Sequence, residues 1–359
     1  MAGNSFGHTL VLTTFGESHG IATGGILDGY PSRIPIDPDF IQSELNRRRT
    51  GQAFYSSSRK EDDTFTILSG IFEGRSTGAP IAFMAANTDA KPEHYSHLKD
   101  VYRPSHADYT WDKKFGIRDY RGGGRASARE TLARVIGGAL AKLMLVEPGI
   151  SVTAYVSQIG TCKLSADYIP VDIPALSNSK LGCPDPDAEA EMISLLETAK
   201  AEGDTLGGMI SCSIRGVPAG LGEPVFDKLS ADLAKAMLSI PSVRGFEYGL
   251  GFSAAFLKGS EHNDRFINRN GTITTATNRS GGIQGGISNG NEIQFRVAFK
   301  PVASLMKSQE TVSREGEPVT LEGKGRYDVC VVPRAVVIVE AMAALVVADH
   351  YLRQRQPEE

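Results

Sequence analysis

Two segments of this chain are too apolar to lie on a protein surface, and they constrain its fold more than any other feature. Residues 132–146 follow the pattern Ser127-Ala-Arg-Glu130, which is typical of a helix N-terminus. Pro333 opens a second such segment, which runs to about Arg353. Because a helix that is apolar on most faces must be covered on several sides, we predict two buried central helices.

Shorter patterned segments supply the covering layers. Asp37-Pro38 predicts the start of a helix that ends at residues 47–49, and residues 187–202 and 230–238 predict two further helices. We expect strands between glycine turns at 7–15, 205–217, 246–258, 272–277 and 292–300. Since strands and helices come in blocks and do not alternate strictly, we expect an α+β fold with largely antiparallel sheet.

Composition and charge exclude several classes of function. The net charge of −4 gives no reason to expect nucleic acid or an anionic membrane as a partner. The longest apolar run, 335–348, is interrupted by Glu340, and the N-terminus lacks the pattern of a signal peptide. The four cysteines are far apart, which argues against a structural zinc site and fits reduced thiols. We therefore expect a cytoplasmic globular protein without a bound metal.

The first segment that could carry chemistry is Gly16-Glu-Ser-His-Gly20. It matches the G-x-S-x-G pattern of serine hydrolases, in which Ser18 would be the nucleophile, but it lies too early in the chain to follow a central strand and an oxyanion loop. Alternatively, it is a tight turn that presents His19, whose side chain can exchange a proton near neutral pH. A purely structural turn is the third reading.

Two further segments join arginines to a histidine or to glycines. In Arg103-Pro-Ser-His106 an anion clamp could lie beside an acid, although His106 could also be an ordinary loop residue. Residues 118–130 carry arginines on both sides of three glycines and lead into the first apolar helix, which favours an anion site at its N-terminus. An RGG-like RNA-binding segment is the alternative reading of that run.

The last third of the chain holds paired glycines at 281–282 and 285–286, a Lys300-Pro turn, and Asp328 beside Arg326. Paired glycines let the backbone approach a flat or phosphorylated ligand closely, so this block suits a cofactor site. Each of these motifs, taken alone, is more often a structural turn.

Taken together, the motifs resemble those of chorismate synthases. The sequences GESHG, RPSHADY, RDYRGGGRASARET, GVPAGLGEPVFD (216–227) and GRYDVCVVPRA (325–335) occur in the order of that family, and the resemblance spans residues 1 to about 354. It implies a single domain over 1–359, with antiparallel sheets around central buried helices, assembled as a homotetramer. It also implies a phosphate lyase that converts 5-enolpyruvylshikimate 3-phosphate to chorismate with reduced FMN.

The resemblance assigns residues by motif. His19 would assist the departing phosphate, His106 would keep the reduced flavin protonated or tune its charge, and Asp328 would help to return a proton. The expected substrate residues are Ser18, Arg48, Arg103, Arg129 and Arg334. The expected FMN residues are Arg125, Ala126, Ser127, Pro241, Ser242, Gly285, Lys300, Pro301, Val302, Ala303, Ser304, Met306, Lys307, Thr311 and Arg326.

The chain departs from the family pattern at three positions. Phe54 stands where many relatives carry an arginine, which leaves Arg59 as the candidate to reach that region. Tyr327 stands where a histidine or a serine is more usual, and Ala126 stands where a serine is frequent. Neither change removes a proposed proton carrier. The compact length favours dependence on an external reductant over reduction of the flavin by NADPH.

Overall fold

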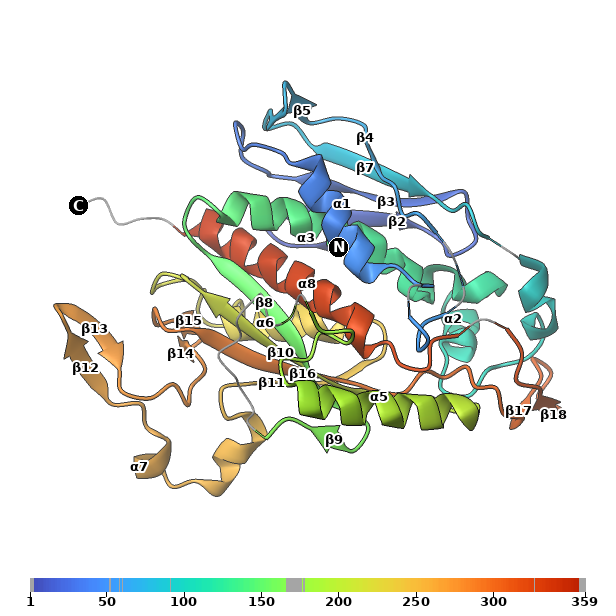
Figure 1. Cartoon of the computed structure of the whole chain (residues 1–359). Coiled ribbons are helices and arrows are strands. Elements are labelled where there is room, and N and C mark those ends of the chain that lie inside the picture. Colours follow the sequence, from blue (N-terminus) through green and yellow to red (C-terminus); the bar gives the residue numbers. More distant parts are fainter. Residues whose placement is uncertain are drawn as a thin grey trace.

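The computed structural model describes residues 3–51, 53–57, 59, 61–90, 92–165, 176, 178–325 and 327–354. Its centre is a layer of helices enclosed between two five-stranded antiparallel sheets (Figure 1). One hydrophobic core, extending from Leu10 to Ala348, joins all three layers. The predicted α+β arrangement of antiparallel sheets around buried helices is therefore confirmed.

The first sheet comes from the N-terminal quarter of the chain and has the order β1-β2-β3-β7-β4. Its strands alternate buried and exposed positions, because one face covers the helices and the other faces solvent. The bounds are Ser5–Phe6 (β1), Val11–Gly16 (β2), Ala22–Asp28 (β3), Ile81–Ala86 (β7) and Thr66–Ile67 (β4).

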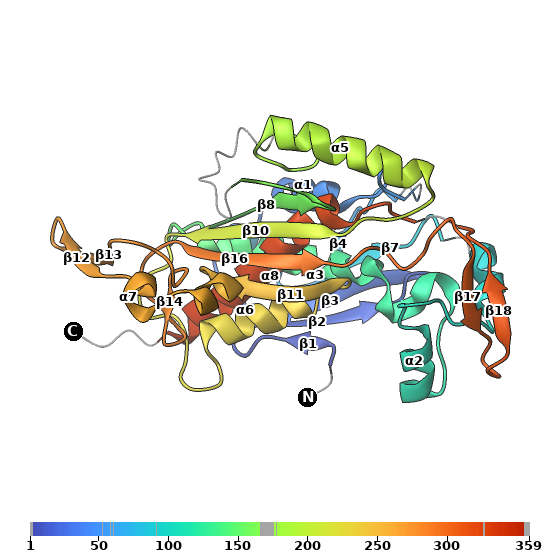
Figure 2. The same cartoon turned by 90° about the horizontal axis from the view of Figure 1, so that it is seen from below.

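The second sheet, with the order β11-β16-β10-β8-β9, covers the other side of the helices. Its central strands are buried over most of their length, since helices pack on one face and further segments cover parts of the other (Figure 2). The bounds are Val243–Tyr248 (β11), Ile293–Phe299 (β16), Gly208–Arg215 (β10), Ser151–Ile159 (β8) and Cys162–Lys163 (β9).

The two predicted apolar helices form the middle of the central layer. They are α3 (Thr131–Leu145) and α8 (Val332–Arg353), and they pack directly against each other. A Cβ atom added at Gly138 would lie 2.3 Å from the Cβ of Ala341, so glycine is what permits this close approach. Helix α3 contacts β2 and β3, and α8 contacts β8 and β10, which explains why both sequences are apolar on most faces.

The remaining elements surround this sandwich. Helix α1 (Pro38–Arg48), capped by Asp37 as predicted, packs on α3 and α8, α6 (Leu229–Leu238) packs on α8, and α5 (Pro186–Ala201) lies outside the second sheet. The others are α2 (Asp108–Phe115), α7 (Gly259–His262), the 3₁₀ turns η1 (Pro92–Leu98), η2 (Arg121–Ala126), η3 (Ala128–Glu130) and η4 (Gly251–Phe256), and the pairs β5 (Ile71–Phe72) with β6 (Arg75–Ser76), β12 (Phe266–Arg269) with β13 (Thr272–Thr275), β14 (Ile283–Gln284) with β15 (Ile287–Ser288), and β17 (Gln309–Val312) with β18 (Pro318–Leu321).

Two strand predictions were wrong in part. The run 7–15 contains the turn of a hairpin, because Gly7 has a φ of 104° and Asp349 of α8 accepts the backbone N–H groups of His8, Thr9 and Leu10. The run 246–258 is a strand only to Tyr248. Glycines at 249 and 251 with positive φ then turn the chain into η4.

Helix α8 is long and apolar enough to cross a membrane, with a mean hydropathy of 1.8. However, 89% of that apolar stretch is buried inside the protein, between α3 and the second sheet. Its hydropathy is therefore accounted for by its place at the centre of the core.

Candidate active site

A cavity of about 380 Å³ collects loop segments from the whole length of the chain at one end of the central helices. Its wall takes residues from the β2–β3 turn, the end of α1, the loop before α2, η3, the α6–β11 turn, the segment after β16 and the start of α8. Fifteen predicted site residues line it: Ser18, Arg48, Arg103, His106, Ala126, Ser127, Arg129, Pro241, Ser242, Lys300, Val302, Ala303, Ser304, Asp328 and Arg334.

The wall is strongly cationic, and most of its arginines have a carboxylate partner in or behind the wall. Arg103 donates from Nε and Nη2 to the two oxygens of Asp108, at 2.8 and 2.9 Å. Arg59 donates to Glu61 at 2.7 Å, and Arg334 contacts Asp328 at 3.3 Å. Such pairs hold each guanidinium group in place, so that its remaining N–H groups can bind an oxyanion.

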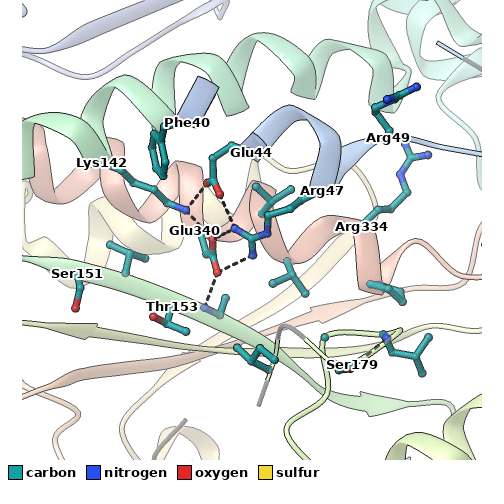
Figure 3. Close-up of a pocket in the computed structure, with 18 of the residues that line it drawn as sticks. Phe40, Glu44, Arg47, Arg49, Lys142, Ser151, Thr153, Ser179, Arg334 and Glu340 are labelled. Atoms are coloured by element: carbon teal, nitrogen blue, oxygen red, sulfur yellow. Dashed lines mark hydrogen bonds and ion pairs between the residues drawn. The ribbon is translucent and has the colours of Figure 1, made fainter. Parts of the chain in front are cut away.

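The three consecutive arginines at 47–49 are divided between two regions. Arg48 lines the 380 Å³ cavity, whereas Arg47 and Arg49 line a neighbouring cavity of about 740 Å³ (Figure 3). In that second cavity Arg47 and Lys142 contact both Glu44 and Glu340. Arg47 and Arg48 diverge because successive side chains leave α1 about 100° apart, whereas Arg49 follows the helix as its C-cap with a ψ of 146°.

The three glycines at 122–124 lie against both candidate histidines, and they all have positive φ. A Cβ atom at Gly122 would lie 2.4 Å from Cε1 of His19, and one at Gly123 would lie 3.1 Å from Cε1 of His106. Glycine is required here because the backbone passes directly over the two rings. Of the arginines around these glycines, Arg129 lines the cavity, while Arg121 pairs with Asp119.

The expected capping box at 127–130 does not form. The Oγ atom of Ser127 accepts the backbone N–H of Arg129 and caps η3, but Glu130 pairs with Arg134. Helix α3 therefore begins at Thr131, one turn after the predicted cap.

His106 lies on the cavity wall with its Nδ1 atom 2.9 Å from Oδ1 of Asp108. Nη2 of Arg103 is also near, at 3.1 Å from Nδ1. Because a carboxylate is the stronger partner, we assign a proton to Nδ1, which leaves Nε2 as an acceptor. Burial lowers the pKa of His106, Asp108 opposes this effect and Arg103 adds to it, so the ring is neutral at pH 7.

His19 lies just behind the cavity wall formed by Ser18, Tyr95 and Gly122. Its ring contacts Tyr95 edge-on at 4.9 Å, and burial, followed by the charge of Arg59, lowers its pKa. Within the described residues, neither ring nitrogen meets hydrogen-bond geometry, although both are buried. The protein therefore leaves the two ring nitrogens incompletely satisfied, although the backbone of Arg121 is close enough to raise the pKa of the ring.

The turn at 16–20 differs from a serine-hydrolase elbow. It joins β2 to β3 in an antiparallel hairpin, whereas the elbow joins a strand to a helix. Ser18 Oγ accepts a hydrogen bond from Nη1 of Arg59 at 3.1 Å, and a guanidinium group cannot act as the general base. The geometry therefore argues against the serine-nucleophile alternative.

The α6–β11 turn and the segment after β16 also contribute residues to the cavity wall. Ser242 has a φ of 73°, and its carbonyl oxygen accepts the N–H of Lys300 at 2.9 Å. The carbonyl oxygen of Val302 accepts a hydrogen bond from Thr205 at 2.9 Å. The first bond joins the two loops, although Lys300 follows Ser242 by 58 positions in the sequence, and the second ties the segment after β16 to the residue Thr205 before β10.

Asp328 faces the cavity from the loop before α8. Its Oδ1 atom accepts the backbone N–H of Ser57 at 2.9 Å and contacts Nη1 of Arg334 at 3.3 Å. These two contacts hold the carboxylate in the cavity wall, between the loop that follows α1 and the start of α8.

Several predicted cofactor residues do not line this cavity. Arg125 donates to Asn4 and Thr14. Gly285 lines a separate cavity beside Phe252. Lys307 pairs with Asp204 at the surface, and Thr311 donates to the carbonyl oxygen of Tyr102. Pro301 and Met306 are exposed outside the lining, and Arg326 lies outside the described residues.

The sequence did not predict some of the residues that line the cavity, or the carboxylates that contact its arginines from behind. Tyr95, Glu61 and Arg244 line the cavity, and Asp63 and Asp108 lie behind its arginines. The acidic run 61–63 was the available signal, since buried arginines need carboxylate partners. Arg59 reaches Ser18 in the wall, while Phe54 stacks on Tyr55 outside it.

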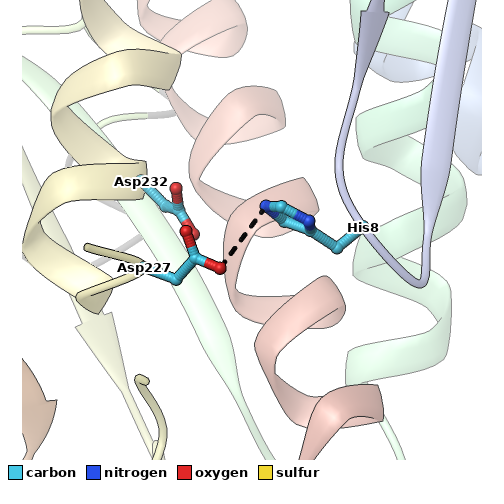
Figure 4. A group of neighbouring side chains, drawn as sticks. All are labelled: His8, Asp227 and Asp232. Atoms are coloured by element: carbon cyan, nitrogen blue, oxygen red, sulfur yellow. Dashed lines mark ion pairs between the residues drawn. The ribbon is translucent and has the colours of Figure 1, made fainter. Parts of the chain in front are cut away.

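In the described part of the chain, three side chains lie close enough together to hold a metal ion, and they lie away from this cavity. They are His8, Asp227 and Asp232 beside α8 (Figure 4). Arg353 contacts Asp227 at 3.2 Å and Asp232 at 3.7 Å, so a fixed cation already lies against both carboxylates. We therefore interpret the group as an ion-pair network.

Comparisons with known proteins agree on one family. The family model described as chorismate synthase matches residues 10–352. A chorismate synthase of Phocaeicola vulgatus is 57% identical over 352 residues, covering 98% of each chain, and that of Christiangramia forsetii is 56% identical over 355 residues, covering 99% of each. A solved crystal structure of chorismate synthase superposes with a TM-score of 0.77 at 32% identity, covering 97% of this chain and 93% of that one.

Proposed function

The chain belongs to the chorismate synthase family, and from this premise we propose how its cavity performs the reaction of that family. The enzyme is a lyase that removes phosphate from 5-enolpyruvylshikimate 3-phosphate to give chorismate, the last common step towards the aromatic amino acids. We propose that the substrate binds against Ser18, Arg48, Arg103, Arg129 and Arg334. The observation that carries this proposal is the cationic cavity wall with a partly buried histidine, His106, in it and a buried one, His19, behind it.

We propose that the same cavity also holds a reduced FMN beside the substrate. Lys300 and Arg244 offer cations to its phosphate, and Gly122 lines the cavity without a side chain. The lining residues that would hold it are Ala126, Ser127, Pro241, Ser242, Lys300, Val302, Ala303 and Ser304. When bound, a reduced flavin would lend electron density to the substrate ring and take it back, so the reaction is redox-neutral overall.

The chain's own groups have three tasks in this 1,4-elimination. As the carbon–oxygen bond to phosphate breaks, the arginines bind the charge that develops on the departing oxygens. Nε2 of His106 accepts a hydrogen bond at the cavity wall, and His19 is the acid beside the departing phosphate. Asp328, whose Oδ1 atom is used by Ser57 and Arg334, offers Oδ2 for the proton that leaves the ring.

Turnover without oxygen tests this proposal. Purified protein with photoreduced FMN and 5-enolpyruvylshikimate 3-phosphate should release inorganic phosphate and form chorismate in equal amounts. The control is the same mixture with FMN left oxidised, which should give no product. Folded, flavin-bound protein that yields neither product under reducing conditions would contradict the proposal.

The source of electrons for the flavin is a separate question. We propose that the enzyme takes reduced flavin from an external reductant, because the chain is compact and lacks long insertions. An aerobic assay with NADPH and FMN, but without photoreduction, should give no chorismate. Turnover with NADPH under these conditions would instead assign a flavin reductase activity to this protein.

We propose that the enzyme works in the cytoplasm as a homotetramer. Four free, buried cysteines support a reducing compartment. Phe226, Phe252 and Phe256 are 78–90% exposed, which is costly unless another chain covers them. A subunit contact there would also bring Gly285 near a neighbouring copy. Light scattering should give a mass of about four chains at micromolar concentration, and a monomer would contradict the assembly.

A further inference from the structure

Asp63 is a buried carboxylate behind the cavity wall that contacts two of its arginines at once. Its Oδ2 atom accepts a hydrogen bond from Nη2 of Arg48 at 2.5 Å, and its Oδ1 atom accepts one from Nη1 of Arg129. All three side chains are almost fully buried. The two arginines come from α1 and η3, about 80 residues apart, so this one carboxylate is what joins them.

The two arginines differ in what else holds them. Arg129 also donates to the side chain of Asn87 at 2.7 Å and to the carbonyl oxygen of Ala86 at 3.2 Å. Within the described residues, the hydrogen bonds of the Arg48 guanidinium go to Asp63 alone, and its Nε atom is buried without a partner. Asp63 therefore fixes the direction in which the free N–H groups of Arg48 point.

The charges around the pair are not balanced. Arg59 has Glu61 and Arg334 has Asp328, one carboxylate for each guanidinium, whereas Arg48 and Arg129 share a single one. The trio thus carries one surplus positive charge in a buried position. Burial is the main cause that lowers the pKa of Arg129; Asp63 opposes this effect, and the nearby charge of Arg48 adds to it.

We propose that Asp63 is a positioning residue that holds Arg48 and Arg129 as a fixed pair for the doubly charged phosphate of the substrate. This inference rests on the proposed function and adds to it the place where phosphate binds. Phosphate is the ligand that we place on this pair, because its negative charge more than offsets the single surplus positive charge and its oxygens can accept the unused N–H groups of Arg48.

The variant Asp63→Asn distinguishes two roles of Asp63, namely positioning the two arginines and adding a negative charge to the site. Asp63 has a φ of 51°, a left-handed conformation that asparagine tolerates well, so the backbone is not strained by this change. Removing a negative charge from the site should strengthen anion binding if only the field matters. If Asp63 positions the arginines, the variant should bind anions more weakly despite its more positive site.

The experiment measures the Kd of inorganic phosphate by calorimetry, and KM and kcat for the substrate with reduced FMN. For Asp63→Asn we expect Kd and KM to rise roughly tenfold or more, with a smaller change in kcat. The matched control is Asp62→Asn, which removes the same charge one residue away from an exposed side chain paired with Arg49, and should change neither constant by more than about twofold.

Two outcomes would overturn the inference. One is phosphate binding in Asp63→Asn that equals or exceeds that of the wild type, and the other is an equal loss in the Asp62→Asn control. If Asp63→Asn does not fold, Arg48→Gln, Arg129→Gln and their double variant decide the matter, because a pair held by one carboxylate must lose phosphate affinity non-additively. Wild-type turnover shows separately whether the proposed function itself holds.

Discussion

Replacing His106 by alanine is expected to lower kcat by about two to four orders of magnitude, the range typical of a lost proton-transfer group. The ring is on the cavity wall, Asp108 binds its Nδ1 atom at 2.9 Å, and its pKa is lowered by burial, so Nε2 is an available acceptor at neutral pH. Alanine removes that acceptor and leaves the arginines of the wall in place.

The measurement is anaerobic turnover with reduced FMN, together with flavin binding by fluorescence. Flavin and phosphate binding should stay within a few-fold of the wild type, because neither depends on a neutral imidazole. His8→Ala is the control, since His8 is an exposed histidine beside α8, far from the cavity. A kcat for His106→Ala within about fivefold of the wild type would remove this histidine from the mechanism.

The second large effect is on stability. Glu340, at the middle of α8, is buried and accepts hydrogen bonds from Arg47 at 2.6 and 3.1 Å, from Lys142 at 2.6 Å and from the backbone N–H of Ala154 at 2.9 Å (Figure 3). Glu44 completes the cluster, which has no net charge. Glu340→Gln should therefore reduce the free energy of unfolding by about 3 kcal/mol, because it leaves one positive charge uncompensated beside the largely buried Lys142.

Urea titration of the wild type, Glu340→Gln and Glu197→Gln measures this loss. Glu197 is exposed on α5, so its variant should lie within about 0.5 kcal/mol of the wild type. Lys142→Met in the Glu340→Gln background should recover part of the loss, because Glu44 and Arg47 then balance each other. If Glu340→Gln has the same free energy of unfolding as the wild type, the cluster adds nothing to stability.

The pH dependence of that stability has a defined sign. Burial alone would raise the pKa of Glu340, but Lys142 and Arg47 lower it to about 2. A carboxylate whose pKa is lower in the folded state stabilises the fold above its unfolded pKa, about 4.3. The contribution of Glu340 is thus complete at neutral pH and is lost as the pH falls from about 4 towards 2.

The helices of the core could be predicted because their signals are local. A run such as 132–146 has apolar side chains on every face, and Asp37 before Pro38 predicts a cap, so the bounds of α1, α3 and α8 agree with expectation within a residue or two. The strand predictions at 7–15 and 246–258 failed at glycines with positive φ, because the conformation of a glycine depends on its tertiary contacts.

For the active site, the chain's own sequence determined which residue types were present and which motifs carried them. Only the tertiary structure decided which of these residues meet. It brought Ser18, Arg48, His106, Lys300 and Arg334 into one cavity wall and left Lys307 at the surface.

The physical reason is that buried charges must be compensated by partners that lie far away in the sequence. Arg47, Arg48 and Arg49 are equivalent in the sequence, yet Glu340, Asp63 and Asp62 separate them into a core cluster, a cavity wall and a surface pair. Such pairings depend on desolvation and on helix packing, and neither is written in a local pattern. The two apolar helices could therefore be read from the sequence, whereas the paired arginines beside them were decided by the fold.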